Sequence, residues 1–152
     1  MYLRSFTREE LISRGVDPKF ARILADPTSY HPDLKFHIGK PHCDYVIPDG
    51  VTDVVPLWDV NADSIVRWNR NGVVEYVWLF HDDANWSLIA KSEQGAMAKL
   101  WQSWAEFQES DDELLRFADT IGFKHGGRAL GLLNASYDEF VAWREELMDD
   151  AV

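Results

Sequence analysis

An Asn-Gly step between two apolar runs places the strongest constraint on how this chain can fold. Asn71-Gly72 separates Ser64–Trp68 from Val73–Phe80, and both runs are rich in β-branched and aromatic residues. Asn and Gly tolerate the positive φ angles of a two-residue hairpin turn, so the two runs should form neighbouring antiparallel strands. Asn85–Ala90 is expected to add a third strand, which makes Val54–Ala90 the sheet core of the protein.

Helix signals lie on both sides of this sheet segment. Five residues stand where an N-cap is expected, three of them in a capping box with Glu three positions later: Thr7, Asp17, Ser92, Ser110 and Ser136. The clearest helix runs from Ser92 to Phe107, where apolar residues recur at three- and four-residue steps. Trp101 and Trp104 belong to this apolar stripe and should therefore be buried.

Two segments show weaker patterns. In residues 28–53, which several Pro and Gly residues interrupt, Leu34–Ile38 alternates apolar with polar residues, and this alternation predicts a half-buried strand. Asp44–Pro48 is a second short candidate strand. Lys124–Asn134 is rich in Gly and is interpreted as a loop or a short strand. Together with the helices, these elements predict one α+β domain over residues 1–152.

Charge is distributed unevenly along the chain. Residues 1–40 hold seven Lys or Arg against five Asp or Glu, a net +2, and residues 41–152 hold eight against twenty-one, a net −13. The sum is the formal charge of −11. A negative field repels nucleic acid, whose binding requires cations that neutralise phosphates. The same field attracts a basic protein and speeds its encounter with the chain.

The expected location is the cytoplasm. No apolar run approaches the roughly 20 residues of a membrane helix, so no membrane partner is expected. The first six residues lack the features of a secretory signal. Cys43 is the single cysteine and cannot form an intramolecular disulfide, which is typical of proteins in a reducing compartment.

Two polar clusters are the candidates for metal-dependent chemistry. One crowds possible zinc ligands into a single irregular segment: His31, His37, His42, Cys43 and Asp44. Their spacing matches no established zinc pattern. The other is His81-Asp82-Asp83, where a His-Asp step suggests a hydrolase, although the further ligands of such an enzyme are missing. A small metal-dependent hydrolase is therefore the alternative, and we assign no catalytic residue, metal ligand or cofactor.

The order of motifs resembles the SUKH superfamily, which includes fungal cell-wall regulators and many bacterial immunity proteins. The resemblance covers roughly residues 47–107. It includes a Pro-Leu-aromatic step, two strands around a Gly-containing turn, an acidic loop and an Ile-Ala-x-Ser helix start: Val55-Pro56-Leu57-Trp58, Ser64–Trp68, Asn71-Gly72, Val73–Phe80, Asp82-Asp83 and Ile89-Ala90-Lys91-Ser92. The usual Gly-Asp-aromatic start of the first strand is replaced here by Asn61-Ala62-Asp63-Ser64.

The resemblance implies a twisted, mostly antiparallel sheet with helices packed around it. It also implies binding without a cofactor, because bacterial members often neutralise a toxin, frequently a nuclease, by contact. We therefore expect a cytoplasmic immunity-type protein that binds a basic toxin domain. A regulatory or scaffold module without a toxin partner is a further alternative.

Four acidic residues are the predicted partner-binding site. Asp59 and Asp63 precede the first strand of the predicted hairpin, and Asp82 and Asp83 follow the second. Because the chain reverses at Asn71-Gly72, these two pairs should meet at one end of the sheet, in loops. Four carboxylates on one rim would suit the Lys and Arg side chains of a basic partner.

Overall fold

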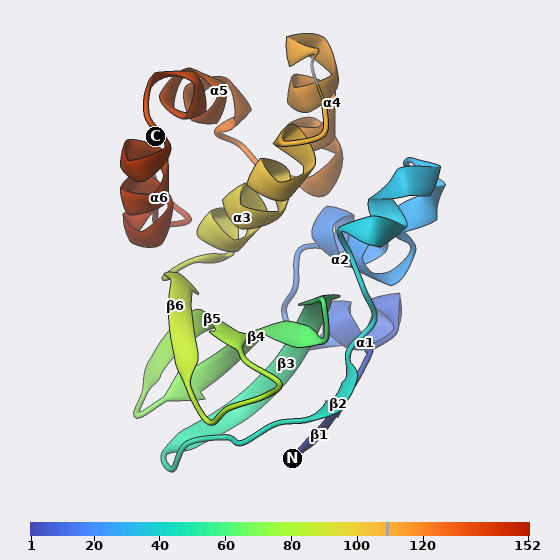
Figure 1. Ribbon diagram of the computed structural model, residues 1–152, viewed down its shortest axis with the longest axis vertical. Helices are drawn as coiled ribbons and strands as arrows, with labels where there is room; N and C mark the ends of the chain where they lie inside the picture. Colours follow the sequence, from blue (N-terminus) through green and yellow to red (C-terminus); the bar gives the residue numbers. More distant parts are fainter. Residues whose placement is uncertain (109) are drawn as a thin grey trace.

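The computed structural model describes residues 1–108 and 110–152, and over these residues the chain forms two antiparallel sheets and six α-helices. The larger sheet has the order β3-β4-β5-β6, and its strands are neighbours in sequence: β3 (Val51–Val60), β4 (Asp63–Arg70), β5 (Val73–Leu79) and β6 (Trp86–Ala90). Figure 1 shows this sheet at one end of the molecule and α3 to α6 at the other. The predicted α+β class and the single domain are confirmed.

The hairpin predicted at Asn71-Gly72 is present. Asn71 has a φ of 53° and Gly72 a φ of 87°, and Arg70 pairs with Val73 across the turn. The side chain of Asn69 accepts a hydrogen bond from the Gly72 N–H at 2.8 Å, which further fixes the turn. The third predicted strand is also confirmed, as β6.

A second hairpin joins β3 to β4 and was not predicted. Asn61 and Ala62 form its turn with φ angles of 51° and 71°, and Val60 pairs with Asp63. The sequence gives no Gly at this turn, and Ala rarely adopts a positive φ. The extended pairing of β3 with β4 therefore determines the conformation of this turn more than the preferences of Asn61 and Ala62 do.

The α-helices lie on both sides of the larger sheet in the sequence. Before it come α1 (Arg8–Ser13) and α2 (Pro18–Ala25), and after it come α3 (Glu93–Ala105), α4 (Asp111–Ile121), α5 (Gly126–Ala135) and α6 (Tyr137–Glu146). All five predicted N-caps accept a hydrogen bond from the backbone of their helix. Among the described residues, no helix is long and apolar enough to cross a membrane.

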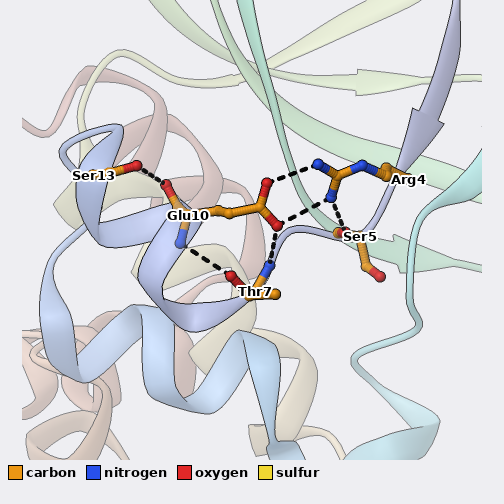
Figure 2. Close-up of polar contacts among 5 residues, drawn as sticks. All are labelled: Arg4, Ser5, Thr7, Glu10 and Ser13. Carbon is orange, nitrogen blue, oxygen red and sulfur yellow. Dashed lines mark hydrogen bonds and ion pairs between the residues drawn. The ribbon is translucent and has the colours of Figure 1, made fainter.

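The capping box of α1 also ties down the preceding strand, as Figure 2 shows. Thr7 Oγ1 accepts from the Glu10 N–H, and Glu10 Oε1 accepts from the Thr7 N–H, both at 3.1 Å. Arg4 donates to the same carboxylate, with an Nη2–Oε2 distance of 2.7 Å. The start of α1 is thus joined to β1 (Tyr2–Arg4), which pairs with β2 (His42–Asp44).

Three predictions for the irregular segments are wrong. Leu34–Ile38 is not a strand, because Pro32 and the His31 side chain, which accepts from the Asp33 N–H, start the 3-10 helix η2 (Pro32–Phe36). Only Asp44 of Asp44–Pro48 belongs to a strand, since β2 ends opposite Tyr2, the residue with which β1 begins. Lys124–Asn134 is mostly helix α5.

The start of α5 explains why glycine there does not break the helix. A Cβ on Gly126 would lie 2.8 Å from the Cβ of Ala118, so only glycine allows this close approach of α5 to α4. Ala129, one turn later, is completely buried. Burial of the apolar side of α5 outweighs the weak helix propensity of its three glycines.

Both faces of the sheet are covered. Ile65 of β4 joins the main core with α2, α3 and α4, whereas Val66 and Trp68 join a smaller core beneath β1 and β2. Trp101 and Trp104 have no exposed surface, which confirms their predicted burial.

Candidate partner-binding site at the acidic end of the sheet

The turn between β3 and β4 lies at the same end of the sheet as the loop between β5 and β6. Val60 pairs with Asp63, and Ser64 pairs with Leu79, so Asp63 stands beside the start of the β5–β6 loop. Asp82 and Asp83 lie in that loop. The predicted proximity of Asp63 to this loop is therefore present. We call this region, with Asp44, Asp63, Asp82 and Asp83, the acidic end.

Asp63 organises the acidic end. Its Oδ2 accepts from Trp78 Nε1 at 2.8 Å, and its Oδ1 accepts from the backbone N–H and the Nδ1 of His81 at 2.9 and 2.6 Å. Partial burial raises the pKa of Asp63, but these hydrogen bonds outweigh it and leave the pKa below its usual value. The ionised carboxylate thus holds the β5–β6 loop against β4.

Asp82 and Asp83 are exposed and border a hollow of about 480 Å³. Asp83 accepts a hydrogen bond from the Asn85 N–H within its own loop. The opposite wall comes from the end of β2 and the residues after it, and includes Asp44, Tyr45 and Val46. The lining that the structure describes contains no Lys or Arg; besides its acids it includes Met1, with the N-terminal amine, and His81.

Asp44 is the acidic residue of this end that sequence reasoning missed. Its side chain is exposed at the end of β2, and its Oδ1 lies 3.9 Å from the N-terminal amine. The pairing of β1 with β2 and the cover that both give to the sheet bring Asp44 to the acidic end. No local sequence signal announces such a pairing between residues about forty positions apart.

Asp59 is not in a loop, as the sequence suggested, but inside β3. Its side chain is 4% exposed, and its backbone exchanges two hydrogen bonds of 2.9 Å with Gly39. The Ser64 hydroxyl donates to Oδ1 at 2.6 Å, and His42 Nδ1 lies 3.6 Å from Oδ2. Burial raises the pKa of Asp59, against the opposing effects of Ser64 and His42. The carboxylate of Asp59 is therefore buried next to the acidic end and is not available to a partner.

The possible zinc ligands of residues 31–44 fall into two separate groups in the fold. His31 and His37 pack edge-on against Trp104, with ring centroids 5.2 and 5.3 Å from it. His42 Nδ1 lies 2.7 Å from the Lys40 carbonyl oxygen, and Cys43 is half-buried in β2. Within the described part of the chain, no three His, Cys, Asp or Glu side chains are grouped so that they could hold a metal ion.

Comparison of the chain with models of protein families, with curated proteins and with solved structures finds no match. The resemblance to the SUKH superfamily therefore stays a prediction.

Proposed function

We propose that this chain is an immunity-type binding protein, without catalytic activity of its own, that neutralises a basic toxin domain by direct contact. One observation carries the proposal. Asp44, Asp82 and Asp83 expose their carboxylates around one hollow, and Asp63 lies directly behind them. The end of β2 and the β5–β6 loop, which are distant in sequence, come together to build this surface.

The arrangement suits recognition because the acids are held before a partner arrives. The Asp63–His81 pair fixes the β5–β6 loop, and the hydrogen bond from Asn85 to Asp83 shapes it further. A preformed loop loses less conformational freedom on binding than a mobile one. The net charge of −13 over residues 41–152 adds long-range attraction for a basic protein.

A nuclease is the toxin class that fits best, because nuclease grooves are basic so that they can bind phosphates. An acidic surface seated on such a groove would exclude the substrate. The resemblance to immunity proteins of the SUKH superfamily points in the same direction.

The test is to co-express the chain with the product of the neighbouring gene and to measure the mass of the complex by light scattering. The activity of that product is then assayed with and without the chain. We expect a stable complex in which the partner's toxicity or nuclease activity is lost. A complex that keeps full activity would favour the scaffold alternative, and a mixture that does not associate would contradict the proposal.

A further inference from the structure

A second hollow, which we call the η2–α3 groove, lies between η2 and the C-terminal end of α3. Its volume is about 620 Å³, within the range of roughly 300–1,000 Å³ that ligand sites occupy. Val60 and Asn61 also line it, so the groove reaches the β3–β4 turn, the same turn that Asp63 follows at the acidic end. A partner seated on the acidic end is therefore close to this groove.

Aromatic rings form the walls of the groove. The His37 ring stands edge-on to Phe107 and to Trp104, with centroid distances of 4.6 and 5.3 Å. Phe36 and Phe107 are 76% and 67% exposed although both are large and apolar. Exposed aromatic side chains that border a hollow are typical of the residues that contribute most to protein–protein binding.

Trp104, beside the groove, carries a hydrogen-bond donor without a partner among the described residues. Trp104 lines the groove with no exposed surface, and its Nε1–H has no acceptor among the described residues. By contrast, Nε1 of Trp101 in the same helix donates to the Leu114 carbonyl at 2.9 Å. Buried N–H groups normally have a partner, and because Nε1 of Trp104 is itself buried, this donor is an unsatisfied group of the core and is not open to a ligand.

The side chains that line the groove have a net negative charge, which favours a positively charged ligand. Asp33 and Glu106 line it and are exposed, and its described lining contains no Lys or Arg. Burial lowers the pKa of His37, so its imidazole is neutral near pH 7 despite the two acids that oppose this shift. The lining therefore carries a charge of −2. The chain already places one cation on a ring here, since Lys35 Nζ lies 5.2 Å from the Phe36 centroid.

We propose that the η2–α3 groove receives an arginine side chain of the same basic partner, with its guanidinium at Asp33 and Glu106 and its stem against Phe36 and Phe107. Arginine fits this lining because it stacks on aromatic rings and donates in a planar fork to carboxylates. This inference rests on the proposed function for the partner's identity, while the chemistry of the groove can be tested without the partner.

The first test titrates the capped peptide acetyl-Gly-Arg-Leu-amide into isotopically labelled protein and follows the amide signals of Ser103 and Phe107 by NMR. The control peptide carries citrulline, a neutral isostere, in place of arginine. We expect saturable shifts with the arginine peptide, and binding about tenfold weaker with citrulline or with Asp33→Asn plus Glu106→Gln, because a charge-assisted contact is lost. The variant Asp49→Asn plus Asp53→Asn, which changes the charge equally elsewhere, should bind like wild type.

Shifts that do not saturate, or equal binding of the two peptides, would overturn the inference. A wild-type dimer that dissociates with Phe107→Ser would also overturn it, because a second copy of the chain would then cover the groove.

The second test uses the partner and separates the two proposals. If the partner binds wild type and the Phe36→Ser plus Glu106→Gln variant equally, the groove inference fails and the proposed function stands. If the partner does not bind at all but the arginine peptide does, the proposed function fails and the cation site stands. Both substituted side chains are exposed, so the variant should fold, and its unchanged circular dichroism is the control.

Discussion

The Nδ1 atom of His81 lies 2.6 Å from Oδ1 of Asp63, and the backbone N–H of His81 donates to the same oxygen. This pair joins the first residue of β4 to the loop that carries Asp82 and Asp83. The hydrogen bond to Asp63 raises the pKa of His81 above its ordinary value of 6.5. The same hydrogen bonds hold the β5–β6 loop against β4 at the acidic end.

Replacing Asp63 with Asn should lower the pKa of His81, because the neutral amide no longer favours the imidazolium. The raised pKa of His81 also makes stability depend on pH. The His81–Asp63 pair stabilises the fold fully below the pKa that His81 has in the unfolded chain, and this stabilisation is lost as pH rises through the pKa of His81 in the folded protein. NMR titration of the His81 ring in wild type and Asp63→Asn measures the shift directly. An unchanged pKa in the variant would show that Asp63 does not hold the loop electrostatically.

The environment of Glu93, the first residue of α3, predicts that the stability of the protein depends on pH. Its Oε2 accepts from the Asp17 N–H at 3.1 Å. Burial, with repulsion from Asp17 and Asp149, raises its pKa from 4.5 to about 7. Between these two values the native state holds a proton that the unfolded chain has released. Stability should therefore fall as pH rises through this window, by about 2 kcal/mol.

The measurement is urea denaturation of wild type and Glu93→Gln at pH 5 and pH 8. Gln keeps an oxygen that can accept from the Asp17 N–H but cannot ionise, so the variant should gain stability relative to wild type between the two pH values. A difference between the proteins that does not change with pH would contradict the raised pKa.

Trp101 and Trp104 form a matched pair in α3, since both are completely buried and, among the residues that the structure describes, only Trp101 has a partner for its Nε1. Trp→Ala at either position should cost about 3–5 kcal/mol. Trp→Phe should separate them: Trp101→Phe leaves the Leu114 carbonyl without its donor, whereas Trp104→Phe removes a donor that had no acceptor. We expect Trp104→Phe to be the milder change by about 1–2 kcal/mol. Denaturant unfolding of both variants tests this, and equal losses would contradict it.

Local chemistry made part of the fold predictable. The positive φ angles of Asn71 and Gly72 and the side-chain cap of Ser92, which accepts from the Gly95 N–H at 3.0 Å, are properties of short segments. Such features act before any tertiary contact forms. The hairpin, β6 and α3 could therefore be predicted from the residues themselves.

The features that the sequence did not reveal depend on contacts between distant segments. Asn61 and Ala62 turn the chain without a glycine because the pairing of β3 and β4 requires it. Asp59 is buried because Gly39, twenty residues earlier, bonds to its backbone, and Asp44 reaches the acidic end only through β1. Of the four predicted site residues, Asp82 and Asp83 lie at the surface of the acidic end and Asp63 lies directly behind them. Asp59 is buried in β3.

The most direct test of the acidic end is the rate at which the basic partner associates. Stopped-flow kinetics would compare wild type with Asp82→Asn plus Asp83→Asn at about 20 mM and about 300 mM salt, conditions that differ strongly in screening. The control, Asp49→Asn plus Asp53→Asn, removes the same charge near the opposite end of the sheet, where Thr52 pairs with Asn69. We expect the first variant to associate about tenfold more slowly at low salt, with a flatter salt dependence, and the control to stay within about twofold of wild type. Wild-type association by the first variant at both salt concentrations, or equal slowing of the control, would contradict binding through the acidic end.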